Sequence, residues 1–191
     1  PHEEMEIVTI VLEGEITHQD SMGNKAVMKP GDVQRMSAGT GLTHSEFNLA
    51  DQPVHFYQIW IFPDTPELKP TYDQKTYEPS QWKNKQFPDA SGQNLQQTVT
   101  FHTDATIYRC DLEKSKNVSL AKTSGRRLFL YLTNGRLTVN NHQVFSKEQA
   151  RMDIDEPLLI KAVENSEFIL IDVPSCKGWG YSSETLQGGG K

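Results

Sequence analysis

The sequence predicts an all-β protein built as a sandwich or barrel, and three observations support that prediction. Short runs rich in β-branched and aromatic residues recur along the chain. Clusters of Gly, Pro, Asn and Asp separate these runs at the spacing usual between strands of a sandwich or barrel. No long amphipathic helical pattern interrupts them. At 191 residues, the chain has the length of one domain or of two small related halves.

The first part of the chain contains a closely spaced series of expected strands. The first strand is β-branched and ends where Gly14 interrupts it, and the next resumes with alternating apolar and polar residues. A turn cluster follows at residues 20–24, and Pro30 with Gly31 ends the third strand. The last strand is rich in aromatic residues and stops at Pro63. We expect strands at residues 6–12, 15–18, 26–28, 33–36, 42–48 and 55–62.

Composition divides the rest of the chain into three parts. Residues 64–94 are rich in Pro, Lys and Gln and show little periodicity, which predicts a linker or long loop. Strand patterns resume beyond this segment at residues 96–100, 106–112, 128–132, 136–139, 158–163 and 168–173. Residues 175–191 are rich in Ser and Gly and are expected to form a flexible tail. The predicted domains therefore span residues 1–63 and 95–174.

A weak internal repeat relates these two domains. Gly14 corresponds to Gly135 at an offset of 121, because similar residues flank both glycines. The offset is 116 between residues 34–36 and 150–152, and 111 between the last strands of the two domains. Insertions and deletions between duplicated halves produce such a steady drift, although strand-turn patterns also resemble one another by chance.

Charge and cysteine content exclude several classes of protein. A net charge of −6 is unsuited to tracking nucleic-acid phosphates, so we expect no direct nucleic-acid partner. The longest apolar run, from Ile7 to Leu12, is too short to span a membrane. Two cysteines form no disulfide framework, which favours a reducing compartment and a cytoplasmic location. The chain starts at Pro1 with a strand pattern close behind, so we expect residues before Pro1 to belong to the first domain.

One pair of residues has the spacing of a metal site. His44 and Glu46 stand two apart in an expected strand, so both side chains should lie on one face of the sheet. Imidazole nitrogen and carboxylate oxygen are suitable ligands for a divalent transition metal. In a closed barrel, His2 could share the lumen with this pair. Spacing alone nevertheless favours a hydrogen-bonded pair on a solvent face, because two residues do not make a motif.

The remaining histidines and the cysteine at position 110 have plainer interpretations. His18 lies in a hairpin arm, which predicts a solvated or turn-stabilising residue. His55 alternates with apolar residues, so a core position is favoured over one that supports the metal ligands. His102 and His142 adjoin turns and are expected at the surface. Cys110 lies within a strand and is expected to be an inert buried thiol.

Several segments of the first domain stand in a specific order and spacing. They are Pro1-His2-Glu3-Glu4-Met5-Glu6, Val11-Leu12-Glu13-Gly14-Glu15, His18-Gln19-Asp20-Ser21-Met22-Gly23-Asn24, Pro30-Gly31-Asp32-Val33-Gln34-Arg35-Met36-Ser37-Ala38-Gly39-Thr40-Gly41 and His44-Ser45-Glu46. Together they resemble the pirin family, two-domain members of the cupin superfamily, and among these the bacterial pirin-like quercetin dioxygenases. The resemblance implies two cupin-type (jelly-roll) β-barrels packed together, the first missing its N-terminal portion.

The resemblance also implies a metal site. Pirins hold their metal with a His-Pro-His segment and a His-x-Glu segment, which map onto His2 and onto His44 with Glu46. The family's first histidine would lie just before the first residue of this chain. In the second domain, the offsets map His44 onto Ile160 or Asn165, so no histidine stands there and no second metal is expected.

The activity that the resemblance implies is a metal-dependent dioxygenase that opens the heterocycle of a flavonol, such as quercetin, with O2 and releases CO. Glu46 would be the catalytic base that takes the proton of the substrate's 3-hydroxyl group, while His2 and His44 hold one divalent metal. Iron is expected, and nickel, copper, zinc and manganese also suit these ligands.

Two other hypotheses remain open. The first is a metal- or redox-sensitive regulatory protein, without turnover of its own, that binds a protein partner. The cationic residues that could form its docking surface, although a solvated rim is favoured, are Lys114, Lys116, Lys122, Arg126 and Arg127. The second is a cupin scaffold without chemistry. In each case we expect a monomer with no membrane partner.

Overall fold

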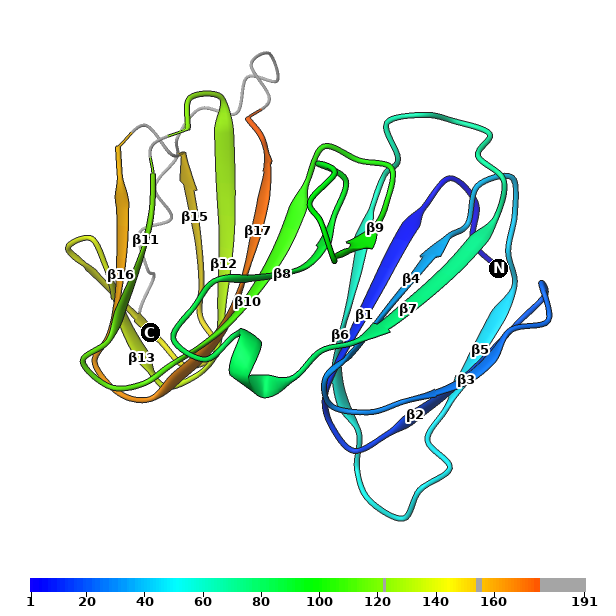
Figure 1. Ribbon diagram of the computed structural model, residues 1–191, viewed down its shortest axis with the longest axis horizontal. Helices are drawn as coiled ribbons and strands as arrows, with labels where there is room; N and C mark the ends of the chain where they lie inside the picture. The colour runs from blue at the N-terminus through cyan, green and yellow to red at the C-terminus, as the bar shows by residue number, and fades with distance from the viewer. Residues whose placement is uncertain (122, 154–155, 176–191) are drawn as a thin grey trace, which may run out of the picture.

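The computed structural model describes residues 1–121, 123–153 and 156–175, and these form two β lobes that lie side by side (Figure 1). The first lobe comprises strands β1 to β7 and the second comprises β8 to β17. Within the described residues, the helical structure is one 3₁₀ turn, η1 (Pro79–Gln81). The prediction of an all-β protein is therefore confirmed.

The first lobe consists of two facing antiparallel sheets. The larger sheet has the strand order β6-β1-β4-β7, and the smaller has the order β3-β2-β5. The strands are β1 (Glu6–Glu13), β2 (Ile16–Asp20), β3 (Lys25–Met28), β4 (Asp32–Ser37), β5 (His44–Phe47), β6 (His55–Ile61) and β7 (Thr71–Thr76). Two small apolar clusters lie between the sheets, one around Ile7 and Met36 and the other around Val11 and Met28.

The second lobe also consists of two sheets. Their strand orders are β15-β12-β17-β10-β8-β9 and β11-β16-β13-β14. The strands are β8 (Phe87–Ser91), β9 (Val99–Thr100), β10 (Thr106–Leu112), β11 (Asn117–Leu120), β12 (Arg126–Asn134), β13 (Arg136–Val139), β14 (His142–Phe145), β15 (Gln149–Asp153), β16 (Leu158–Ala162) and β17 (Ser166–Pro174). One continuous apolar cluster that includes Leu130, Ile160 and Leu170 fills the space between them.

The larger sheets of the two lobes pack against each other through a shared apolar core. Val8, Ile10 and Val33 of the first lobe contact a cluster that includes Phe101 and Ile107 of the second. Successive residues of a strand point to opposite faces, so each of these sheets lines its own lumen with one face and the shared core with the other. The lobes are thus held together by buried apolar surface, which is the dominant stabilising term in folding.

The strand ladders support the predicted internal repeat. In the first lobe, β1 pairs with β4 and β6, and β2 pairs with β3 and β5. In the second lobe, β12 pairs with β15 and β17, and β13 pairs with β14 and β16. The β1–β6 and β12–β17 ladders shift register at corresponding points, next to Glu13 and Asn134.

Gly14 and Gly135 follow these two register shifts and require glycine for the same reason. Their φ angles are +70° and +93°, in the left-handed region that side chains with a Cβ atom avoid. A Cβ atom would also clash with a backbone carbonyl oxygen, of Pro53 in the first case and of Asn165 in the second. The offset of 121 therefore joins structurally equivalent turns.

The structure differs from the expectation over residues 64–94. This segment was expected to be a linker or long loop, but it contains β7, which pairs with β4, and β8, which pairs with β10. The reason is that β7 is a partly buried edge strand with polar residues at most positions, so it lacks the apolar alternation that marks a strand. The expected tail at residues 175–191 lies outside the described residues, apart from Ser175.

Candidate metal centre

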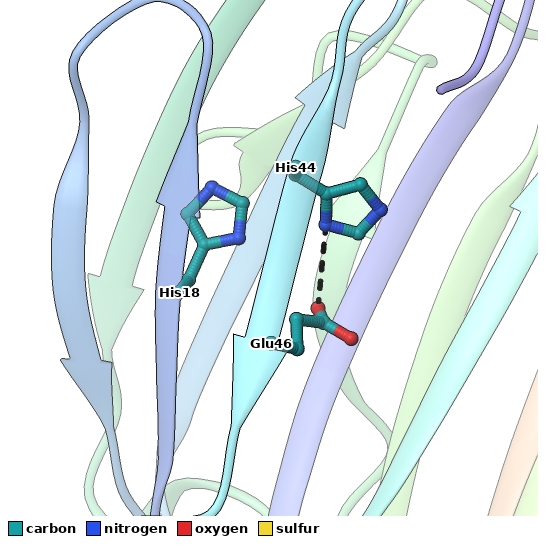
Figure 2. A group of neighbouring side chains, drawn as sticks. All are labelled: His18, His44 and Glu46. Atoms are coloured by element: carbon teal, nitrogen blue, oxygen red, sulfur yellow. Dashed lines mark ion pairs between the residues drawn. The ribbon is translucent and has the colours of Figure 1, made fainter.

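The pairing of β2 with β5 brings three potential metal ligands together. His44 and Glu46 are two residues apart on β5, and the ladder sets His18 of β2 directly opposite Glu46. All three side chains therefore point to the same face of the smaller sheet, into the lumen of the first lobe. Figure 2 shows the three side chains turned toward one another from the two strands. One donor atom from each lies within 4.8 Å of the other two.

This cluster is largely shielded from water. The side chain of His18 is fully buried, and those of His44 and Glu46 are 9% and 16% exposed. Nδ1 of His44 lies 3.9 Å from Oε1 of Glu46, the contact drawn as a dashed line in Figure 2. Burial lowers the pKa of His44, and the neighbouring His18 and His2 lower it further. His44 is therefore held in the neutral form that a metal ligand requires.

The tautomer of His18 follows from its partner Asp20. Nε2 of His18 lies 3.2 Å from Oδ2 of Asp20. Burial opposes ionisation of this carboxyl, but hydrogen bonds from Asn24, His18 and Met22 outweigh it and lower the pKa of Asp20. An ionised carboxylate only accepts hydrogen bonds, so Nε2 carries the proton and Nδ1 keeps its lone pair. A carboxylate in this position typically orients a metal-binding histidine.

Glu46 is supported from the other sheet by Gln58 of β6. Nε2 of Gln58 donates to both carboxylate oxygens of Glu46, each at 3.0 Å. Burial raises the pKa of Glu46, whereas these hydrogen bonds act in the opposite direction. Tyr72 of β7 stacks on His18, with ring centroids 5.4 Å apart, and closes another side of the cluster.

His2 lies at the edge of the same cluster. Its backbone bridges that of Leu42, two residues before His44, through hydrogen bonds of 2.7 and 2.9 Å. The His2 ring lies 5.0 Å from the ring of His44 and contacts Trp60 edge-on at 4.9 Å, measured between centroids. Burial also lowers the pKa of His2. His2 is thus a near neighbour of the three-residue group, though not a member of it.

The structure agrees with some of the sequence expectations for this site and corrects others. His44 and Glu46 share a face, as their spacing predicted, and they face the lumen rather than solvent. His18 was expected to be solvated or to stabilise a turn. Its contact with Asp20 is present, but a solvated His18 is wrong because the side chain is fully buried. The β2–β5 register that brings His18 to the cluster cannot be read from spacing along one strand.

The structure also places His55, His102, His142 and Cys110. His55 was favoured as a core residue, but it is exposed, because it lies at the end of edge strand β6. His142 is exposed as expected, and His102 is 45% exposed while contacting buried Glu6. Cys110 is buried in the second lobe, where burial raises the pKa of its thiol to about 12. The expectation of an inert thiol fits this position.

The donor atoms of the cluster fit a divalent transition metal. Nδ1 of His18 and Nδ1 of His44 are buried and have no hydrogen-bond partner within the described part of the chain. A buried polar atom without a partner costs about 1–3 kcal/mol, and a bound metal would remove this cost for both nitrogens. Two imidazole nitrogens and one carboxylate oxygen are the ligand set of metal sites that keep open positions for further ligands.

Two clefts of the structure lie away from this cluster. One, of about 480 Å³, is lined by residues of both lobes, including Tyr57 and Trp82. The other, of about 540 Å³, is in the second lobe beside Val139 and Met152. None of His18, His44 and Glu46 lines either cleft. In the described residues, no helix has the length and apolar character needed to cross a membrane.

Comparison with known families identifies both lobes. Residues 1–61 match the family profile described as Pirin, and residues 90–173 match the profile described as the quercetinase C-terminal cupin domain. A protein of Escherichia coli K12 named quercetin 2,3-dioxygenase is 36% identical over 176 residues, covering 91% of this chain and 74% of that protein. A pirin-like protein of Caulobacter vibrioides is 33% identical over 173 residues, covering 90% of this chain and 75% of its own.

Solved structures show the same fold. The crystal structure of YhhW from Escherichia coli matches with a TM-score of 0.85 and 34% identity, over 92% of this chain and 74% of that one. A second structure, of the bacterial pirin YhhW in complex with nickel(II), matches with a TM-score of 0.84 and 32% identity, over 92% and 75% of the two chains. The two lobes are cupin domains, as the resemblance implied, and the chain belongs to the pirin family.

Proposed function

We propose that this chain forms the metal-dependent site of a dioxygenase that opens the heterocycle of a flavonol of the quercetin type. The observation that supports this proposal most strongly is the buried group of His18, His44 and Glu46, in which two histidine nitrogens have no other partner. The name quercetin 2,3-dioxygenase, carried by a relative that is 36% identical, indicates the reaction.

The overall reaction is balanced without a further oxidant. Both atoms of O2 enter the opened product, and one carbon of the flavonol leaves as CO. A metal bound at the cluster would supply an electrophilic centre that orients the flavonol and activates it toward O2. The residues of the chain supply the remaining functions: they hold this centre, take up a proton and limit the access of water.

Glu46 is the proposed catalytic base. A flavonol must lose the proton of its 3-hydroxyl group before the ring reacts, and a carboxylate at the site can take that proton. Trp60, exposed beside the cluster, also suits contact with a planar aromatic molecule. Trp60 is 55% exposed while its ring contacts His2 edge-on, so a flat ring could stack beside the cluster.

Two ligand sets are compatible with the cluster, and they differ in one histidine. The sequence resemblance implies His2, His44 and Glu46, whereas the donor atoms that lie closest together belong to His18, His44 and Glu46. We therefore propose His44 and Glu46 as ligands in both sets. Comparing the affinity of His2→Ala and His18→Ala for nickel or iron separates them, because loss of a direct ligand weakens binding more than loss of a neighbour. Iron is proposed as the native metal, with nickel, copper, zinc and manganese as alternatives.

The test of the function is oxygen uptake and CO release with quercetin. The metal-loaded protein should consume one O2 per CO formed, and Glu46→Gln should lower kcat/KM by about 100- to 10,000-fold. Glu156→Gln is the matched control, because Glu156 is exposed in the second lobe and should leave the rate unchanged. One bound metal without turnover of any flavonol would contradict the proposal.

The regulatory alternative is less well supported by the surface. Arg126 forms ion pairs with Asp104 and Asp172, and Arg127 with Asp153, so these two arginines are largely neutralised. Lys122 lies outside the described residues. A protein partner, a monomeric state and a cytoplasmic location stay predictions from the sequence.

A further inference from the structure

Two side chains of β6 connect the metal cluster to the protein surface. Gln58 and Trp60 are two residues apart on this strand, so their side chains lie on the same face of the sheet, toward the lumen of the first lobe. Nε1 of Trp60 donates to Oε1 of Gln58 at 3.1 Å, and Nε2 of Gln58 donates to both oxygens of Glu46 at 3.0 Å. The result is a short chain of directed hydrogen bonds that runs from an exposed indole to a candidate metal ligand.

The direction of this chain determines the orientation of the Gln58 amide. An indole N–H only donates a hydrogen bond, so it must face the carbonyl oxygen of Gln58 rather than its NH2 group. The NH2 group is then turned toward Glu46, where it meets two acceptor oxygens. In the flipped orientation, the carbonyl oxygen of Gln58 would face the carboxylate, and the indole N–H would face another donor. Trp60 therefore excludes the orientation that would repel an ionised Glu46.

The hydrogen bond between Gln58 and Glu46 also joins two separate sheets. β5, which carries Glu46, is an edge strand of the smaller sheet, and β6 is an edge strand of the larger one. No ladder pairs these two strands among the described residues, so backbone hydrogen bonds do not set the position of Glu46 relative to β6. The hydrogen bonds from Gln58 to Glu46 therefore fix this relative position, on the side of the lumen where Trp60 is exposed.

We propose that Gln58 is a positioning residue for Glu46 and that Trp60 holds Gln58 in the required orientation. The proposal deepens the function proposed above and rests on it in one respect, that Glu46 acts at the metal. Gln58 touches neither metal nor substrate in this scheme. It fixes the plane of the carboxylate, so that one oxygen can face the metal while the other can face the substrate hydroxyl.

The experiment compares metal affinity and the visible absorption of the Co2+-loaded protein in four proteins. Gln58→Leu keeps the volume of the side chain and removes its hydrogen bonds to both Glu46 and Trp60. Trp60→Phe keeps a ring and removes only the indole N–H. Gln143→Leu is the control, because Gln143 is exposed in the second lobe. We expect the Kd for Co2+ to rise about 10- to 100-fold in Gln58→Leu. In Trp60→Phe it should rise about 2- to 10-fold, the size of one neutral hydrogen bond.

The cobalt absorption bands report the ligand geometry and should shift in Gln58→Leu but not in Gln143→Leu. A Glu46→Ala background provides the decisive comparison. If Gln58 acts through Glu46, adding Gln58→Leu to Glu46→Ala should change the Kd by less than about 3-fold, because coupled residues are not additive. The proposal would be overturned if Gln58→Leu left both the Kd and the absorption unchanged. It would also be overturned if Gln58→Leu raised the Kd by the same factor in the Glu46→Ala background as in the wild-type protein.

These readouts do not depend on turnover. If the wild-type protein fails to consume O2 with quercetin, the proposed function fails, while the cobalt measurements still decide whether Gln58 positions Glu46. If turnover is found and the cobalt measurements show no coupling, the dioxygenase proposal stands and the positioning role fails.

Discussion

The two lobes share one framework but differ in what fills their lumens. In the second lobe, a single apolar cluster joins both sheets. In the first lobe, the apolar residues form two small clusters, and His18, His44 and Glu46 also occupy the lumen. The strand ladders pair His18 with Glu46 in one lobe and Val139 with Ile160 in the other. The same pair of positions therefore carries potential metal ligands in one lobe and core packing in the other.

The contrast extends to the residues around these positions. Gln58, which holds Glu46, lies opposite Thr9 in its ladder, and the corresponding pair in the second lobe is Leu170 and Leu130. Both leucines are buried in the apolar cluster of the second lobe. The same fold therefore accommodates either a polar or an apolar lumen when the residues that line it differ together. The lumen of the second lobe is thus an apolar core, whereas the lumen of the first contains the potential metal ligands.

The largest expected effect on stability comes from placing a residue type of the first lobe in the lumen of the second lobe. Ile160→Glu puts a carboxylate at the position that corresponds to Glu46, where the surrounding cluster consists of apolar side chains. Burying an unpaired carboxyl group costs several kcal/mol, so we expect a loss of at least about 3 kcal/mol in the free energy of unfolding. Urea denaturation followed by circular dichroism measures this loss.

The matched control for this substitution is the next residue along β16. Leu159 is 47% exposed and points away from the lumen, so Leu159→Glu should change stability by no more than about 0.5 kcal/mol. Similar losses in the two variants would show that the second lumen is not the apolar core that the comparison requires.

A smaller effect is expected where the two lobes meet through polar groups. The fully buried carboxylate of Glu6, in the first lobe, lies 2.9 Å from Nδ1 of His102 and accepts a hydrogen bond from Ser37 at 2.8 Å. His102→Ala leaves Glu6 with one partner fewer and should cost about 1–3 kcal/mol in unfolding free energy. His142→Ala, at an exposed histidine, should cost less than about 0.5 kcal/mol. Equal melting temperatures for the two variants would argue against a stabilising contact between the lobes.

The pH dependence of metal binding should reflect the titratable groups in and beside the lumen of the first lobe. Burial lowers the pKa of His44 and of His2, so both are neutral at pH 7 and protons do not compete with the metal there. As the pH falls further, these histidines begin to bind protons, and burial raises the pKa of Glu46 so that it competes too. Affinity should therefore be nearly constant from pH 8 to 7 and should then fall by up to about tenfold per pH unit for each proton displaced.

Competition with a chelator at several pH values measures this dependence. A metal affinity that increases as the pH falls, or that drops steeply between pH 8 and 7, would contradict binding by buried neutral histidines.

The last expected effect is that of a thiol reagent on Cys110 in the second lobe. Burial raises the pKa of Cys110 to about 12, so almost no thiolate is present at pH 8. We expect native Cys110 to react more than about 100-fold more slowly than in the urea-unfolded chain, which peptide mass spectrometry can follow. Rapid labelling without loss of structure would show that the second lumen opens readily.

Much of the fold could be predicted from the sequence, because apolar alternation and turn residues mark most strands. The exceptions have physical causes. β7 is a polar edge strand and shows no alternation, so its segment was interpreted as a linker. The repeat offsets mapped His44 onto Ile160, whereas the β13–β16 ladder shows that Ile160 corresponds to Glu46. The offset in numbering between corresponding residues of the two lobes changes once more between β4 and β5, and this change accounts for the difference.

The site could be predicted only in part for a related reason. Residues two apart on one strand share a face, so the approach of His44 to Glu46 follows from spacing. The positions of His18 and Gln58 depend on strand pairing and on the facing of two sheets, which spacing along one strand does not contain. The assignment of His2 comes from the family resemblance, and the structure places its ring 5.0 Å from the ring of His44.

The most direct test of this account is the number of metal ions that the chain binds and the residues on which binding depends. Titration with Ni2+, followed by calorimetry and by metal analysis after gel filtration, should give one ion per chain. His44→Ala should weaken binding by more than about 100-fold, since even residues that only support ligands are worth about 10- to 100-fold. His142→Ala should leave binding unchanged. Two ions per chain, or full affinity in His44→Ala, would contradict a single metal centre in the first lobe.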